Sequence, residues 1–333
     1  MRFRPPILTA LCISFLFTFL YLLPAEAASA TQKVVVSFAG LNERLGVLFV
    51  AKEPGIFHRH GLDVQLVHMR SGPVGISALT TGDSQLHFGS ATGASLGAMA
   101  AGLDLVFIAG LIKKLDGYFV VVPQIKSPSD LKGKNIGVVS IGGAVWMFTM
   151  LAFEHWGLNP ERDNINFRVL PNDSVVAQAI TTGTIDGANV AYTYGTNLER
   201  QGYRVLADLA KLDISFQGTG VLARRSFVQR SPEIAERALR AIVETIAFIQ
   251  NPAHKAAVMQ SLARWLRLPK VGDAEGGYEM MKGTYDRRIY PNVDGLRNVI
   301  RLLGKTNESI RRLRAEDIVD DRIVGKLERE GLF

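Results

Sequence analysis

Short apolar runs alternate with amphipathic runs along the chain from residue 33 onward. Val34–Phe38 and Leu62–His68 are rich in β-branched and aromatic residues, which is typical of buried strands. Glu43–Lys52 and Pro73–Thr81 lie after these strands and are predicted as helices, the second ending at Gly82. Such an alternation of strands and helices predicts an α/β fold.

The alternation stops near Lys113 and starts again at Tyr118. The second series has predicted strands at 118–122, 135–139, 165–170 and 185–190 and predicted helices at 143–156 and 174–182. Predicted helices at 232–250, 252–266, 277–287 and 293–303 follow, and we expect them to pack back on the first series. The pattern predicts two open-sheet lobes joined by two hinge strands: residues 33–112 plus 217–333 form the first lobe, and 113–216 the second.

The N-terminal segment has the pattern of a secretory signal peptide. Arg2 and Arg4 precede the uncharged apolar run Ile7–Leu23, and Ala25-Glu26-Ala27 matches a cleavage site. We therefore predict that residues 1–27 are a cleaved signal and that the mature protein is periplasmic. An uncleaved N-terminal membrane anchor is the alternative, since the run is almost long enough to span a bilayer.

Charge and cysteine content restrict the possible functions. The chain has 333 residues with 38 Lys and Arg against 31 Asp and Glu, and loss of the signal would leave a net charge of +6. Basic residues are dispersed, and Arg311–Arg314 is followed at once by acidic residues, so we expect no nucleic-acid partner. A mild positive field favours anionic small molecules.

The single cysteine, Cys12, lies within the predicted signal. A mature chain without cysteine excludes a thiol nucleophile, an iron–sulfur cluster and a Cys-ligated zinc site. His58 and His60 resemble a metal-binding pair, but no third ligand is evident in the sequence. We expect neither a metal nor a cofactor.

Five loops follow predicted strands and are candidates for a binding site, because ligands of open sheets bind at the carboxyl ends of the strands. They are Ala39–Asn42, Arg70–Gly72, Gly89–Thr92, Ser140–Gly143 and Asn189–Tyr192. Most combine glycine with a hydroxyl or amide residue before a helix, where free backbone N–H groups favour an anion. An ordinary helix cap is the alternative for each loop. None contains His, Asp or Glu, so the loops indicate binding and not catalysis.

Several phrases of the sequence resemble one protein family. The run GVLFVAKEPGIF at Gly46–Phe57 is followed by HGLDVQL at His60–Leu66, and four further segments agree in order. These segments are Gly82–Phe88, Ser129–Val138, Trp156–Pro160 and Ile180–Gly187. Together they resemble the nitrate, taurine and aliphatic-sulfonate (NitT/TauT) binding proteins of ABC transporters, within a superfamily that includes thiamine-pyrimidine synthesis proteins. The resemblance covers about residues 33–260.

The resemblance implies a periplasmic-binding-protein type II fold that closes on a small ligand and delivers it to a membrane permease with its ATPase. It places the ligand against the five loops, at Asn42, Ser71, Ser90, Thr92, Ser140, Gly142, Asn189 and Tyr192. Gly143 departs from the pattern, since many relatives have a hydroxyl residue there, and Arg70 is the nearest candidate to pair with an anion. A monomer is expected, although no pattern in the sequence determines the oligomeric state.

Aromatic residues near the loops bear on the kind of ligand. Trp146, Tyr192 and Tyr194 lie within a turn of two of the loops and could stack on an organic molecule, whereas nitrate needs no such surface. For Trp146 the alternative is a place in the core, beside Phe148, Leu151 and Phe153 on one apolar helix.

The leading hypothesis is therefore a periplasmic receptor, and not an enzyme, for a small anionic organic ligand such as a sulfonate or carboxylate. The alternative is an enzyme on the same fold. Thiamine-pyrimidine synthases need a cysteine-rich iron-binding stretch that the mature chain lacks, and menaquinone-pathway enzymes are cytoplasmic, which the predicted signal opposes.

Overall fold

A computed structural model describes Met1 and residues 31–333 of the chain. The predicted signal peptide, residues 1–27, lies outside the described residues apart from Met1. Within the described part, no helix is both long and apolar enough to cross a membrane.

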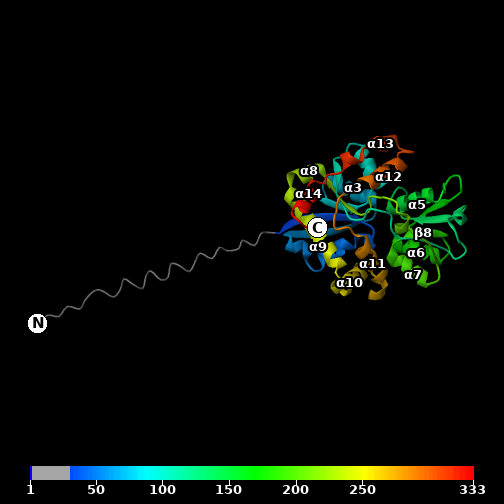
Figure 1. Cartoon of the computed structure of the whole chain (residues 1–333), viewed down its shortest axis with the longest axis horizontal. Helices are drawn as coiled ribbons and strands as arrows, with labels where there is room; N and C mark the ends of the chain where they lie inside the picture. Colours follow the sequence, from blue (N-terminus) through cyan, green and yellow to red (C-terminus); the bar gives the residue numbers. More distant parts are fainter. Residues whose placement is uncertain (2–30) are drawn as a thin grey trace.

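The α/β prediction is confirmed, since the chain forms two five-stranded mixed sheets (Figure 1). The first sheet has the order β2-β1-β3-β10-β4. Its strands are β1 (Gln32–Ala39), β2 (Leu62–Met69), β3 (Leu86–Gly89), β4 (Leu105–Gly110) and β10 (Gly220–Arg224). β1 lies parallel to β2 and β3, while β10 returns antiparallel between β3 and β4. Alternate β1 residues Val34, Val36 and Phe38 are buried, as a covered sheet requires.

The second sheet has the order β7-β6-β8-β5-β9. Its strands are β5 (Tyr118–Val121), β6 (Asn135–Val138), β7 (Asn166–Val169), β8 (Gly187–Val190) and β9 (Arg204–Asp208). β6 is parallel to β7 and β8, and β5 is antiparallel to both β8 and β9. The predicted lobe ranges remain a prediction, and we use them below as names: the first lobe contains the first sheet and the second lobe contains the second.

Helices cover both sheets. Those of the first lobe are α1 (Gly46–Lys52), α2 (Ile56–Arg59), α3 (Gly72–Thr81), α4 (Gly93–Ala100), α8 (Arg225–Arg230), α9 (Pro232–Gln250), α10 (Lys255–Leu266), α11 (Glu275–Thr284), α12 (Val293–Leu303), α13 (Glu308–Arg311) and α14 (Arg322–Arg329). Those of the second are α5 (Ala144–His155), α6 (Asp173–Thr181) and α7 (Tyr192–Arg200). Short 3₁₀ turns are η1 (Glu43–Leu45), η2 (Pro128–Leu131), η3 (Leu209–Leu212), η4 (Pro252–His254), η5 (Val271–Ala274) and η6 (Ala315–Ile318).

Two chain segments cross between the lobes and pair with each other. Lys114 and Ser215 form an antiparallel bridge. On either side of it, the Leu115 N–H donates to the Ile214 carbonyl (3.1 Å) and the Phe216 N–H to the Lys113 carbonyl (3.0 Å). The hinge stays a prediction, and such a paired crossing would suit it, because few residues would have to change conformation if the lobes moved.

The C-terminal helices pack on the first lobe, as expected, and one of them also contacts the second lobe. α9, α10, α11 and α14 share one core of the first sheet. Leu296 of α12 belongs to a second core, which contains Leu222 of β10 as well as Phe148 of α5, and α12 lies beside α5 (Figure 1). Arg301 of α12 also donates to both carboxylate oxygens of Glu154 (2.8 and 2.7 Å), which holds the pKa of that carboxyl down at about 2. α12 therefore helps to hold the two lobes together.

A buried histidine lies in the first sheet. His87 of β3 is 3% exposed, and its Nδ1 lies 2.9 Å from the Ser37 Oγ. Burial disfavours the charged ring and lowers the pKa of His87 to about 4. The folded protein therefore holds this histidine neutral at pH values where an unfolded chain would protonate it.

This difference predicts an acid sensitivity that His87→Gln removes. A depressed folded-state pKa means that stability is present above the unfolded value near 6.5 and is lost as pH falls toward 4. Between pH 7 and 4.5, wild-type protein should lose about 2 kcal/mol more unfolding free energy than His87→Gln, measured by urea titration. The exposed His155→Gln should retain the wild-type pH profile. Identical losses in wild type and His87→Gln would contradict the assignment.

Candidate functional site

The two lobes touch through loops that follow their strands. Leu41–Arg44, which leads from β1 into α1, contacts the beginning of α7. The Glu43 Oε1 accepts from the Thr193 N–H (3.2 Å), and the Tyr194 hydroxyl donates to the Leu41 carbonyl (3.4 Å). We refer to the contact between lobes formed by Asn42, Glu43, Arg44, Gly93, Asp116, Gly142, Asp173, Asn189 and Thr193 as the inter-lobe interface.

An ion pair lies buried in this interface. The Arg44 Nε donates to the Asp116 Oδ1, and the Arg44 Nη2 donates to the Asp116 carbonyl (3.3 Å). The guanidinium also lies 5.1 Å from the ring centroid of Phe148, a cation–π contact with α5. Burial raises the pKa of Asp116 despite the opposing charge of Arg44. For Arg44, burial acts against the charged form, but Asp116 and Glu43 together hold its pKa above the ordinary value.

A second contact across the interface uses a predicted site residue. The Asn42 Nδ2 donates to the Asp173 Oδ2 (2.8 Å) at the start of α6. Its Oδ1 accepts from the Arg44 N–H (3.1 Å) and so caps η1. Burial raises the pKa of Asp173, although the bond from Asn42 acts in the opposite direction. The Asn42 side chain therefore caps η1 in its own loop and also binds the second lobe.

The helices α4 and α5 begin close together across the interface. The Gly93 N–H donates to the Gly142 carbonyl (2.9 Å), and Gly142 has φ of +74°, which glycine adopts without strain. Beside this contact, Thr92 and Ser95 form a reciprocal cap: the Ser95 N–H donates to the Thr92 Oγ1 (3.3 Å) and the Thr92 N–H to the Ser95 Oγ (2.9 Å). The helix-cap interpretation therefore holds for Thr92.

Asn189, at the end of β8, forms a hydrogen bond beside the ion pair. Its Nδ2 donates to the Asp116 carbonyl (3.1 Å), and its side chain is almost fully buried. Among the predicted site residues, Asn42, Thr92, Gly142 and Asn189 therefore lie at the inter-lobe interface or next to it.

The other predicted residues lie in several places. Ser71, Ser90 and Ser140 are half-buried in their loops, and the carbonyls of Ser90 and Ser140 accept from the Ser95 Oγ (3.3 Å) and the Gly143 N–H (3.2 Å). The Tyr192 hydroxyl donates to the Asp208 Oδ1 (2.6 Å), and its ring meets Tyr118 edge to face. Trp146 packs near Phe167 in the second lobe, which agrees with the core alternative. Ligand contacts of these residues stay predictions.

The sequence interpretation did not identify Glu43, Arg44, Asp116 and Thr193 as interface residues. Glu43 and Arg44 come directly after Asn42, at the start of a predicted helix, where charged residues usually face solvent. Both are buried. The predicted loop ends at Asn42, so the acid and the base that follow it, Glu43 and Arg44, were not among the candidate site residues.

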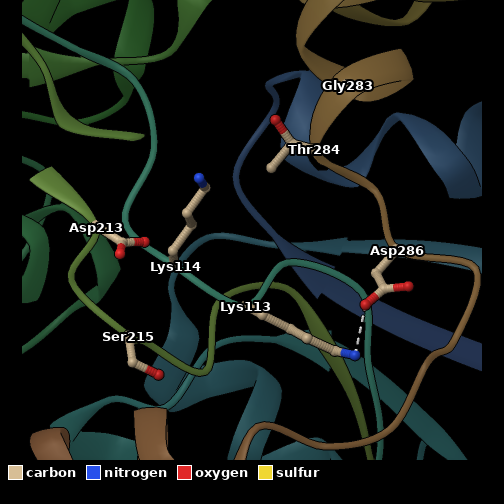
Figure 2. Close-up of a pocket in the computed structure, with 7 residues that line it drawn as sticks. All are labelled: Lys113, Lys114, Asp213, Ser215, Gly283, Thr284 and Asp286. Carbon is tan, nitrogen blue, oxygen red and sulfur yellow. Dashed lines mark hydrogen bonds and ion pairs between the residues drawn. The ribbon is translucent and has the colours of Figure 1, made fainter. Parts of the chain in front are cut away.

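Two open cavities lie beside the chain crossings. The first, of about 410 Å³, is lined by Lys113, Lys114, Asp213, Ser215, Gly283, Thr284 and Asp286 (Figure 2). In it the Lys113 Nζ donates to the Asp286 Oδ2 (2.6 Å), while Lys114 points toward the space between Asp213 and Thr284. The second, of about 360 Å³, includes Tyr192 and Asp208. Neither is lined by Asn42, Gly142 or Asn189, and Tyr192 is the one predicted ligand residue among their lining residues.

One member of the histidine pair, His60, contacts a carboxylate. The His60 Nε2 lies 2.7 Å from the Glu244 Oε2, and Arg59 contacts the same carboxylate. Within residues 31–333, no group of three His, Cys, Asp or Glu side chains is placed to hold a metal ion.

The Asn42–Asp173 bond can be tested by exchanging its partners. Asn42→Asp keeps an oxygen to cap η1 but sets two carboxylates against each other across the interface. We expect this variant to shift the equilibrium toward separated lobes by about 1–3 kcal/mol and to increase the radius of gyration measured by small-angle X-ray scattering. Adding Asp173→Asn places an amide donor opposite the new carboxylate at position 42. The radius of gyration should then return to the wild-type value. If the radius of gyration of the double variant stays above the wild-type value, the Asn42–Asp173 bond does not hold the lobes together.

Comparison with curated proteins finds relatives over nearly the whole chain. Proteins of Brucella abortus, Brucella suis and Brucella melitensis, provisionally named as binding proteins with no ligand stated, are each 26% identical over 310 residues. The match covers 89% of this chain and 93% of each relative.

Comparison with solved structures shows the fold. The periplasmic aliphatic sulphonate binding protein SsuA of Escherichia coli has a TM-score of 0.71 at 19% identity, over 87% of this chain and 92% of its own. The periplasmic nitrate-binding protein NrtA of Synechocystis PCC 6803 has a TM-score of 0.70 at 14% identity, over 90% and 88%. The predicted periplasmic-binding-protein fold is thereby confirmed.

The family model described as NMT1/THI5 like matches residues 42–255, which run from the first interface residue into the C-terminal helices and span more than half of the chain. This match confirms the resemblance found in the sequence. The chain belongs to the NMT1/THI5-like family.

Proposed function

We propose that this protein is the solute receptor of an ABC transporter, and that it captures a small organic molecule with an anionic group between its lobes in the periplasm. The observation that carries the proposal is the inter-lobe interface, in which loops at the strand ends of both sheets meet directly. A ligand that contacts both lobes binds the closed form best and shifts the population toward it. A permease and its ATPase would recognise that closed form.

The anionic group of the ligand is best placed near the beginnings of α4 and α5. Both helices begin at the interface, and their dipoles favour a negative charge there. The predicted residues Ser71, Ser90, Thr92, Ser140 and Gly142 lie in the loops before α3, α4 and α5. Asn42, Asn189 and Tyr192 would then contact the remainder of the ligand.

The sulphonate- and nitrate-binding proteins with the same fold support a receptor, and the periplasmic location of those two proteins supports export of this chain. The predicted secretory signal at residues 1–27 agrees with this location. The interface loops supply hydroxyls, amides and backbone N–H groups, which suit binding and release without a chemical step.

The proposal predicts that purified protein binds a small molecule with a measurable gain in stability. Compounds released from denatured protein are identified by mass spectrometry and returned to ligand-free protein beside taurine, alkyl and aryl sulfonates, nitrate and aromatic carboxylates. A ligand at about a hundred times its Kd should add roughly 2.7 kcal/mol, a rise of a few degrees in Tm. Absence of any released compound together with no shift from the panel would contradict a receptor function.

Loop hydroxyls supply a second prediction. Ser90→Ala and Ser140→Ala should each weaken binding of the identified ligand about three- to tenfold, because each removes one hydrogen bond to it. Isothermal titration calorimetry measures this loss. Ser77→Ala, on the exposed face of α3, is the matched control and should bind like wild type. Wild-type affinity in both loop variants would remove these loops from the binding site.

A further inference from the structure

Helix α12 begins at the predicted hinge, where the side chain of Asn292 holds it. The Asn292 Nδ2 lies within hydrogen-bond distance of the Lys113 and Phe216 carbonyls, the second at 3.1 Å. Lys113 and Phe216 belong to the two chain segments that cross between the lobes. The Asn292 Oδ1 accepts from the Gly295 N–H (3.0 Å) and so caps α12. The start of α12 is therefore bound to both crossing segments.

The first turns of α12 also pack closely on the second crossing segment. A Cβ added to Gly295 would lie 2.3 Å from the Phe216 carbonyl carbon and from the Gln217 nitrogen, so only glycine fits there. The Gln217 Oε1 accepts from the Asn292 N–H (2.6 Å), and the Asn298 Nδ2 donates to the Ser215 carbonyl (2.9 Å). Moving this end of α12 away from the hinge would break all of these contacts.

Beyond the hinge, α12 is tied to the first lobe. It shares a core with β10 of the first sheet. Arg297 of α12 pairs with Glu316 of η6. Directly after η6, Val319 forms a parallel bridge with Phe107 of β4. These contacts link α12 to two strands of the first sheet, so we expect it to move with the first lobe.

The far end of α12 contacts the second lobe through charged groups. Arg301 donates to both carboxylate oxygens of Glu154 on α5, and the Lys305 Nζ donates to the Glu154 Oε1 (2.8 Å). We call Glu154, Arg301 and Lys305 the α5–α12 ion cluster. The Glu154 side chain is 37% exposed, so water and salt reach the cluster and its free energy is modest.

The position of this cluster makes it sensitive to lobe movement. Arg301 lies nine residues after Asn292, which places it about 13 Å further along the helix. A rotation about the crossing segments displaces Glu154 from Arg301 by an amount that grows with this distance. The cluster is therefore formed when the lobes touch and is lost when they separate. A contact made in only one of two states shifts the equilibrium toward that state.

We propose that the α5–α12 ion cluster is a latch that favours the closed form of the protein before any ligand binds, and that Glu154 is its positioning residue. The effect on capture rests on the proposed receptor function. When the closed form is a minor state, the apparent affinity is proportional to its population. The latch therefore raises the affinity for a ligand that it does not touch.

The latch is tested first without ligand, by the distance between spin labels on cysteines introduced at the exposed positions Leu103 and Val169, one in each lobe. Electron–electron double resonance on ligand-free wild type should show a minor short-distance population beside a longer one. Glu154→Gln should lower the ratio of short to long about two- to fivefold, the range expected for a half-exposed ion pair. An unchanged ratio would overturn the latch.

Glu308→Gln is the matched control. Glu308 of α13 is also paired with two basic residues, Arg311 and Arg312, but all three belong to the first lobe. This variant should keep the wild-type ratio. A fall as large as that in Glu154→Gln would mean that loss of any paired carboxylate changes the ratio, and the inference would fail.

Exchange of the charges distinguishes the latch from a general effect at position 154. Glu154→Lys faces Arg301 and Lys305 with a like charge, so the ratio should fall further than in Glu154→Gln. Adding Arg301→Glu restores an attractive pair and should raise the ratio again. If the double variant stays as low as Glu154→Lys alone, the two helices are not joined by this pair in the closed form.

The outcomes also separate the latch from the receptor function. The ratio in ligand-free protein decides the latch even when no compound binds. The compound released from purified protein should bind Glu154→Gln more weakly by the same factor by which the ratio falls, as measured by titration calorimetry. A lower ratio with unchanged Kd would refute the effect on capture. Absence of any released compound, with no binding from the panel, would remove the receptor function alone.

Discussion

The buried ion pair between Arg44 and Asp116 determines how the two lobes meet. Arg44 comes from the loop after β1, and Asp116 comes from the segment that enters the second lobe. Removing one partner of a buried pair leaves an uncompensated charge, at a cost of about 3–5 kcal/mol, so the pair is stable only in the orientation that completes it. Phe148 and Asn189 fix that orientation from α5 and β8. The contacts Asn42–Asp173 and Gly93–Gly142 follow from the same alignment.

Elements whose apolar residues face a core were predictable from the sequence. α9 and α12 have the predicted limits, Pro232–Gln250 and Val293–Leu303, because an apolar stripe and a clear N-terminal signal mark each of them. α7 was not predicted as an element: Tyr192–Arg200 carries Gly195, Asn197 and Glu199 and is mostly polar. Its helical state depends on packing against α6, β5 and α11, which the local pattern does not contain.

The loops of the candidate site were predictable from the sequence, but the contacts that their residues make were not. The rule that ligands bind at strand ends identified the loops that contain Asn42, Gly142 and Asn189, which the fold brings to the interface. The rule does not show that Glu43 and Arg44 turn inward, because burial of a charge depends on a partner more than 70 residues away in the sequence, as Asp116 is from Arg44.

The central claim is that a ligand draws the two lobes together. The most direct test is a spin-label distance between cysteines introduced at Leu103 in the first lobe and Val169 in the second, since both positions are exposed. Electron–electron double resonance should show a broad distribution with longer distances in ligand-free protein. The compound released from purified protein should collapse it to one short distance. Identical distributions with and without saturating ligand would contradict the account.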